Sequence, residues 1–229
     1  MSSIALTAVH TGAGGYWFGN GNQSFATVRG GDATNKTYDS DTQYAEYLDS
    51  NDGTAHFDAH ARGISEFDLT AVPAGVTVTA ATLTLYGTSR NVFGSQYVVI
   101  DLATAFANNL ANFNLANFAG VEQASNRIAL SAWALSDGAN VFTLNATCIA
   151  NIQAKLSGSI YLATRVSGDF DNVAPSWSGD NAAYAVHNGV GHSDATVHPK
   201  LTLTYTVPVS LEGIERTPIR GAGRGIMRP

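Results

Sequence analysis

The chain has 229 residues, of which 45% are apolar and only 13% are charged, and its formal net charge is −6 at pH 7. This length permits one large domain or two small ones, and this apolar content is normal for a packed core. Residues 1–209 carry 8 Lys and Arg against 16 Asp and Glu, whereas residues 210–229 carry 4 Arg against 2 Glu. An acidic body argues against nucleic acid as the main partner.

The N-terminal segment, MSSIALTAVHTGAGG, has neither the basic stretch nor the apolar run of a secretory signal peptide. No stretch reaches the roughly 20 apolar residues of a membrane helix, so we expect no membrane partner. A single cysteine, Cys148, excludes an internal disulfide and leaves the compartment open. We expect either that an export signal was removed or that the protein leaves the cell another way, such as assembly into a virus particle released by lysis.

Short segments of alternating apolar and polar residues recur along the chain and are joined by Gly, Asn and Asp. This alternation is typical of strands with one buried and one solvent-facing side, and the spacing of the segments predicts a β-sandwich. The expected strands lie near residues 3–9, 25–29, 55–61, 64–69, 76–86, 97–102, 139–144, 159–166, 182–187 and 200–207.

Residues 62–86 show this pattern most clearly and predict a strand, a tight turn and a second strand. Pro73-Ala74-Gly75 supplies the turn, because Pro fixes φ and Gly tolerates positive φ. The expected pairing partner lies far away, at residues 198–206, where the same alternation returns. The core side chains predicted from these segments are Phe67, Leu69, Leu83, Leu85, Leu201 and Leu203.

These segments resemble the DNRLRE-domain family of jelly-roll β-sandwiches, which are similar to carbohydrate-binding modules. The resemblance is carried by Phe67-Asp68-Leu69-Thr70, Val72-Pro73-Ala74-Gly75, Val78, Ala81, Leu83, Leu85, Tyr86 and the closing strand from Pro199 to Tyr205. It extends over residues 1–207. In the family an Arg often precedes the Phe-Asp-Leu run, where this chain has Glu66, so no role of that Arg carries over. The resemblance implies a fold, and a fold alone does not imply a function.

Two segments have helical spacing. Residues 145–156 place Ile149, Ile152 and Leu156 on one face, and residues 103–113 have a similar spacing despite their Asn content. The expected fold is therefore an all-β jelly-roll sandwich with one or two short helices, formed by residues 1–209 and followed by an extended C-terminal arm.

No catalytic signature is present, because the chain lacks a nucleophile elbow, a zinc-protease helix, a phosphate loop and a dinucleotide fingerprint. Paired carboxylates could cleave a glycoside, which leaves a glycan-cleaving enzyme as an alternative, but no pair stands out. We expect no enzyme activity.

Metal ligands are also sparse. His56 and His60 lie four apart in an expected strand with no third ligand, so we interpret them as ordinary strand histidines. Asp49 to Gly53 and Asp169 to Asn172 are oxygen-rich turns that suit calcium, although Asn and Asp also cap their own backbone without metal. We expect plain turns and no cofactor, with calcium as the alternative.

Aromatic side chains could form a stacking platform for a sugar. The candidates are Tyr16, Trp17, Trp177 and Tyr184, with Trp17 in a Gly- and Asn-rich loop at 11–24. The alternatives are that Trp133 and Trp177 fill the core, and that exposed aromatics mark a protein interface.

Residues 210–229, SLEGIERTPIRGAGRGIMRP, differ in composition from the rest of the chain. Arg recurs every four residues, but Pro218 and the glycines exclude a stable helix. The alternatives are a disordered end and an extended arm that docks on another protein, and we expect the arm. The docking residues would be Ile214, Arg216, Ile219, Arg220, Arg224, Ile226 and Arg228.

The sequence therefore predicts a non-enzymatic structural component of a bacteriophage virion, first a capsid decoration (cement) protein and next a tail or head-fibre part. Its expected partners are other virion proteins of the capsid or tail and further copies of itself. The alternative is a non-catalytic carbohydrate-binding or adhesion module of a secreted or tail-fibre protein, which binds a surface glycan outside the cell or at the cell surface.

Overall fold

Antiparallel strands dominate the computed structural model, which describes residues 1–17, 23–31, 35–50, 57–104, 115–176 and 181–208. The strands are β1 (Ser2–Thr7), β2 (His10–Trp17), β3 (Asn35–Tyr38), β4 (Thr42–Ser50), β5 (Phe57–Asp68), β6 (Thr77–Asn91), β7 (Tyr97–Leu102), β8 (Ile128–Ala129), β9 (Gly138–Thr143), β10 (Ser159–Val166), β11 (Asn181–Asn188) and β12 (Lys200–Thr206). Hydrogen bonds join them in the order β1-β12-β6-β11-β4-β5-β10-β7-β8, with β2 and β3 beside β5 and β9 beside β6.

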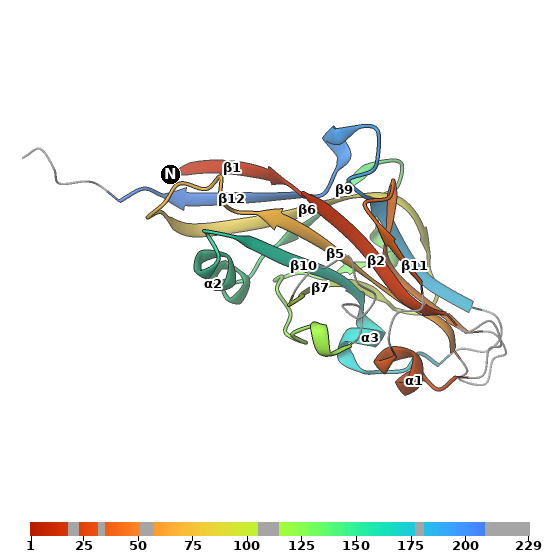
Figure 1. Ribbon diagram of the computed structural model, residues 1–229. Coiled ribbons are helices and arrows are strands. Elements are labelled where there is room, and N and C mark those ends of the chain that lie inside the picture. The colour runs from red at the N-terminus through yellow and green to blue at the C-terminus, as the bar shows by residue number, and fades with distance from the viewer. Residues whose placement is uncertain (18–22, 32–34, 51–56, 105–114, 177–180, 209–229) are drawn as a thin grey trace, which may run out of the picture.

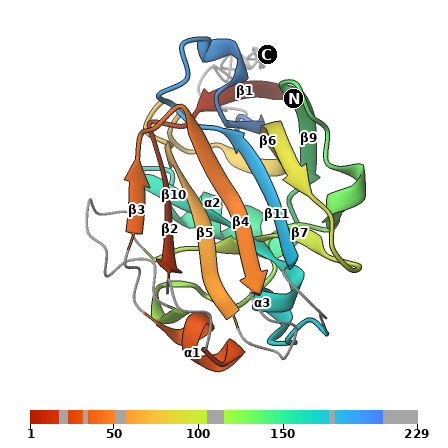
Figure 2. The ribbon, with the colours of Figure 1, turned by 90° about the vertical axis from the view of Figure 1, so that its right-hand side faces the viewer.

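Two long strands, β5 and β6, connect the two layers of the sandwich. The first half of β5 pairs with β4 and its second half pairs with β10, while β6 pairs first with β12 and then with β11. Because each long strand changes neighbours midway, the sheet curls over and encloses a core between two antiparallel layers (Figure 1). Figure 2 shows β2, β5, β4 and β11 side by side on one face. The expected all-β sandwich is confirmed.

Alternation along the strands supplies the core. The pairing predicted for the C-terminal strand is confirmed, since Leu83 of β6 lies opposite Leu201 of β12. All six predicted core side chains are buried, each with at most 1% of its surface exposed. Burial of each such side chain contributes about 1.5–3 kcal/mol. Trp133 also fills the core, and its Nε1 donates to the carbonyl oxygen of Val186 at 3.2 Å.

The turn at 73–75 joins two layers rather than two paired strands. Gly75 has φ +75°, as expected for a turn glycine. β5 and β6 share no ladder, and β6 pairs with β12 instead, as the sequence predicts. The buried side chains of Leu69, Val72 and Val76 hold the crossing chain against the core instead. The strands expected at 55–61 and 64–69 are one continuous strand, β5.

Three short α-helices lie among the described residues: α1 (Phe25–Gly30), α2 (Ala146–Ala154) and α3 (Ser167–Asp171). The prediction of α2 is confirmed, and its N-cap is Asn145, whose Oδ1 accepts from the Cys148 N–H at 3.0 Å. The strand expected at 25–29 is wrong. Ser24 caps this segment as a helix, and only Val28 of its side chains is buried, so the segment has no strand-like alternation to satisfy.

Two further segments differ from the prediction or lie outside the described residues. The glycine-rich segment expected as a loop at 11–24 forms β2 up to Trp17, because its backbone pairs with β5 on one side and β3 on the other. Most of the helix expected at 103–113 lies outside the described residues. In the part of the chain that the structure describes, no helix has the length and apolar character needed to span a bilayer.

Candidate functional site

A cluster of charged side chains lies on the far side of β5, β10 and β7 from the main core. Arg62 on β5, Arg165 on β10 and Asp101 on β7 project from adjacent strands. Asp169 reaches the same place from α3, which lies beside α1 at one end of the molecule (Figures 1 and 2). All four side chains are at most 1% exposed. We call them the buried arginine cluster.

Asp169 is the centre of this cluster. Its carboxylate accepts from Arg62 Nε at 2.9 Å, from Arg62 Nη2 at 2.8 Å and from Arg165 Nε at 2.6 Å. Its backbone carbonyl accepts from Arg29 Nε of α1 at 2.8 Å and from Arg165 Nη2 at 3.1 Å. One residue thus ties α1, β5 and β10 to α3.

The second carboxylate, Asp101, fixes a loop. It accepts from Arg165 Nη1 at 2.8 Å and from the backbone N–H groups of Gly120 and Val121 at 3.1 and 3.3 Å. The loop in turn places Phe118 over both guanidinium groups, with its ring centroid 5.1 Å from the Arg62 Cζ and 5.6 Å from the Arg165 Cζ. Such cation–π contacts add about 2 kcal/mol or more when they are desolvated.

Ionisation of the cluster follows from its burial. Burial opposes the charge on Asp169, but attraction to Arg62 and the hydrogen bonds from Arg62 outweigh it and hold the Asp169 pKa well below its usual value. Burial lowers the pKa of His60 to about 4, with Asp169 opposing that shift. His60 is therefore neutral at pH 7, although its Nε2 lies 3.3 Å from Asp169 Oδ2.

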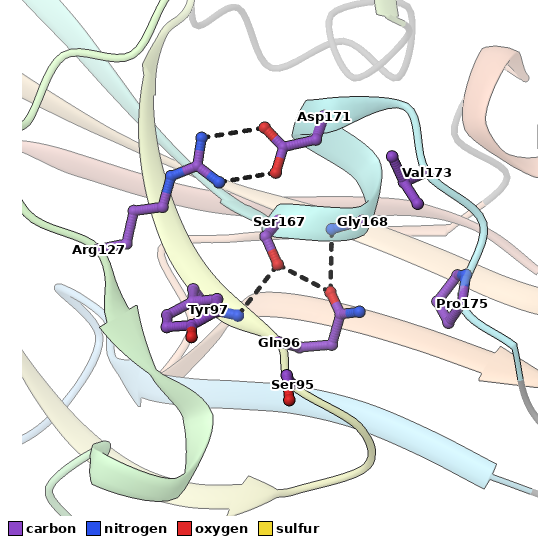
Figure 3. A pocket seen from close by; sticks show the side chains of 9 residues that line it. All are labelled: Ser95, Gln96, Tyr97, Arg127, Ser167, Gly168, Asp171, Val173 and Pro175. Atoms are coloured by element: carbon purple, nitrogen blue, oxygen red, sulfur yellow. Dashed lines mark hydrogen bonds and ion pairs between the residues drawn. The ribbon is translucent and has the colours of Figure 1, made fainter.

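A pocket of about 240 Å³ opens beside the cluster, between the start of β7 and α3 (Figure 3). It is lined by Ser95, Gln96, Tyr97, Arg127, Ser167, Gly168, Asp171, Val173 and Pro175. Gln96 is fixed in place, since its Oε1 accepts from Ser167 Oγ and from the Gly168 N–H, both at 2.9 Å. The side-chain amino group of Gln96 donates to no described residue.

Arg127 forms the charged edge of the pocket. It makes two hydrogen bonds to Asp171, at 2.7 and 2.9 Å, and two to Glu122, both at 3.1 Å. These bonds, first those to Asp171 and then those to Glu122, raise the pKa of Arg127. The three groups together carry one net negative charge, so the pocket edge disfavours an anion and suits a neutral hydroxyl-rich ligand or a cation.

The buried arginine cluster and the pocket differ in whether a ligand can reach them. The buried arginine cluster is sealed from solvent, so its groups cannot touch a substrate and their role is to hold elements together. The pocket is open, but the carboxylates at its edge are both bound to Arg127. Among the described residues no group of three or more His, Cys, Asp or Glu is arranged to hold a metal ion.

Most of the site residues predicted from the sequence lie outside the part of the chain that the structure describes. The docking residues from Ile214 to Arg228 and the aromatic Trp177 lie outside the described residues, as does His56. The backbone of Tyr16 and Trp17 lies in β2, opposite His60 and Ala59, but their side chains are not described. The oxygen-rich turn at 169–172 belongs to α3 and to the residue that ends it, and its carboxylates bind arginines.

Sequence reasoning missed the buried arginine cluster and the pocket. The available signal was an Arg inside each of two predicted strands, at 62 and 165. A buried charge requires a partner, but the partners lie up to 107 residues away in the chain.

The chain was compared with models of known protein families and with curated protein sequences, and neither comparison returned a match. The resemblance to the DNRLRE-domain family stays a prediction.

Proposed function

We propose that the protein is a non-enzymatic structural component of a bacteriophage virion, first a capsid decoration protein, and that it docks on the particle through residues 210–229. The observation that carries the proposal is the way the chain leaves the sandwich. β12 ends at Thr206, and the next residue, Val207, is 60% exposed. The described part of the chain therefore ends at the surface. The sequence of residues 210–229 that follows has four Arg at intervals of four and apolar residues between them.

The chemistry of the described residues supports a structural role. The charged groups of the buried arginine cluster bind one another, and those at the pocket edge are paired. The acidic body carries few charges overall, and the arm is basic, so the arm could bind carboxylates of a neighbouring virion protein. Ile219 and Ile226 would supply apolar anchors.

Truncation tests the docking arm. Full-length protein and residues 1–209 are mixed with particles that lack the protein, and each mixture is sedimented. We expect only the full-length protein to co-sediment, while circular dichroism of the truncated chain keeps its β-signal. Replacement of the four arm Arg by Gln should weaken docking, and the loss should be smaller at high salt, where salt already screens the Arg–carboxylate pairs of the wild type. Equal sedimentation of both chains would place the attachment on the sandwich instead.

The pocket favours a second candidate, a non-catalytic carbohydrate-binding or adhesion module. Its lining combines an exposed aromatic ring, Tyr97, with a fixed Arg127–Asp171 pair and the side-chain amide of Gln96, whose NH2 donates to no described residue. Sugars bind such combinations of an aromatic face and planar polar groups. Calorimetric titration with a panel of monosaccharides tests it. Binding that is lost in Gln96→Ala and kept in Thr84→Ala, on a distant strand, would support this candidate.

A further inference from the structure

The outer edge of β1 is open, and this edge is independent of the proposed docking arm. β1 pairs with β12 over six residues without a register shift, and it lies at the end of the strand order. Alternate N–H and C=O groups of an antiparallel strand point to opposite sides, so half of those in β1 point away from β12. None of them bonds to another residue among those that the structure describes. Figure 1 shows β1 beside β12 at the margin of the sheet.

Other margins of the fold are blocked or short. At β9 the side chain of Asn126 covers the edge, because its Oδ1 accepts from the Thr143 N–H at 2.8 Å and its Nδ2 donates to the Val141 carbonyl at 3.2 Å. Ser125 adds a further hydrogen bond to the Thr143 carbonyl, at 2.8 Å. β8 has only two residues and β3 has four. Proteins commonly protect edges in these ways.

β1 carries none of these protections. Its sequence, Ser-Ser-Ile-Ala-Leu-Thr, has no charge and no Pro, and it contains no bulge. Ser3, Ala5 and Thr7 point to the exposed face, while Ile4 and Leu6 point toward the core. A long, uncharged and uncovered edge is a template for another strand.

We propose that β1 pairs antiparallel with β1 of a second copy, so that the sheet continues across a two-fold axis. The body of the protein is acidic, and like charges would separate two copies at most surfaces, but β1 brings no charge to its edge. A register centred on Ala5 keeps core-facing residues on one face. It places Ile4 opposite Leu6 of the second copy and Ser3 opposite Thr7, so the half-buried Ile4 gains an apolar neighbour.

The register predicts a specific cross-link. Two copies of Ala5 would face each other directly, with their Cα atoms about 4.5–5.5 Å apart, which a disulfide can span. The only native cysteine, Cys148, is fully buried and does not compete. Thr202 is a matched control, since it lies opposite Ala5 on β12. It is one strand further from the edge, so two copies of Thr202 would be about 14 Å apart.

The test uses the full-length chain. Wild type should sediment as a dimer, and Ala5→Cys should oxidise to a covalent dimer at least about tenfold faster than Thr202→Cys. Ala5→Lys should sediment as a monomer with an unchanged circular dichroism spectrum, because it places two like charges face to face on an exposed strand. A monomeric wild type, equal cross-linking of the two cysteine variants, or a dimer that persists in Ala5→Lys would each overturn the proposal. None of these variants alters the arm, so the outcome is separate from the docking proposal.

Discussion

At the level of single residues, Asp169 links several elements of the fold, and the sequence around it does not predict this role. It binds Arg62 and Arg165 with its carboxylate, and its carbonyl receives Arg29. A buried ion pair contributes little net stability over an apolar pair of the same size, but the loss of one partner is costly because a charge stays buried without compensation.

Asp169→Asn should therefore reduce the free energy of unfolding by about 3–5 kcal/mol. The substitution keeps the shape of the side chain and removes the charge that two buried guanidinium groups face. Urea unfolding followed by circular dichroism measures the change. Asp171→Asn is the control, because that carboxylate is partly exposed in its pair with Arg127, and its loss should cost about 0–1 kcal/mol. Equal costs for both variants would contradict the structural role of the buried arginine cluster.

Because two histidines are buried, the free energy of unfolding should depend on pH. Burial lowers the pKa of both His60 and His187 to about 4. Between about pH 6.5 and 4 the unfolded chain binds protons that the folded chain does not, so the free energy of unfolding should fall as the pH falls through this window. The contribution of Asp169 acts in the same direction below about pH 4, because its folded pKa is lower than its unfolded value.

Urea unfolding of the wild type at pH 7.5 and at pH 5 measures this dependence. In His187→Gln the difference between the two pH values should shrink, because one of the two groups can no longer take up a proton. The unfolding energy of this variant at pH 7.5 gives the cost of the substitution itself. A wild type that is equally stable at both pH values would contradict the account.

At the element scale, two long strands determine the shape of the fold. Alternation in the sequence was enough to find the second of them, β6, its partner β12 and the buried face of both. It was not enough to show that residues 55–69 form one strand, or that the turn after them crosses between layers. Those properties depend on pairing with distant segments, such as β4 and β10, which local patterns do not specify.

Truncation of a core side chain between these strands should lower the stability of the fold. Leu83→Ala removes buried methyl groups opposite Leu201 and should lower the free energy of unfolding by about 2–5 kcal/mol. The adjacent residue, Thr84, points to the other face of β6 and is not buried, so Thr84→Ala should change stability by about 0.5 kcal/mol or less. Similar costs for the two variants in thermal or urea unfolding would show that the inner and outer faces of β6 had been assigned wrongly.

The candidate site was harder to predict from sequence than the core. Arg165 and Asp169 lie only four residues apart, but Arg62 and Asp101 come from distant strands, and no spacing in the chain predicts that all four meet. The helix α1 was missed for a similar reason, since Thr27 and Val28 favour a strand while the cap at Ser24 and the contact of Arg29 with Asp169 favour a helix.

For the whole molecule we propose two separate means of assembly. The edge of β1 suits a second copy, and the chain that leaves β12 suits a different protein. Together they would allow a dimer that is anchored by two arms, and two linked anchors bind far more tightly than one.

Electron cryomicroscopy of the assembled particle shows directly whether the arm attaches the protein to the virion. We expect residues 210–229 to lie along a neighbouring virion protein, with arm arginines beside its carboxylates and the sandwich projecting outward. Particles that lack the protein, or a map in which the sandwich makes the attachment and residues 210–229 contact nothing, would contradict the account.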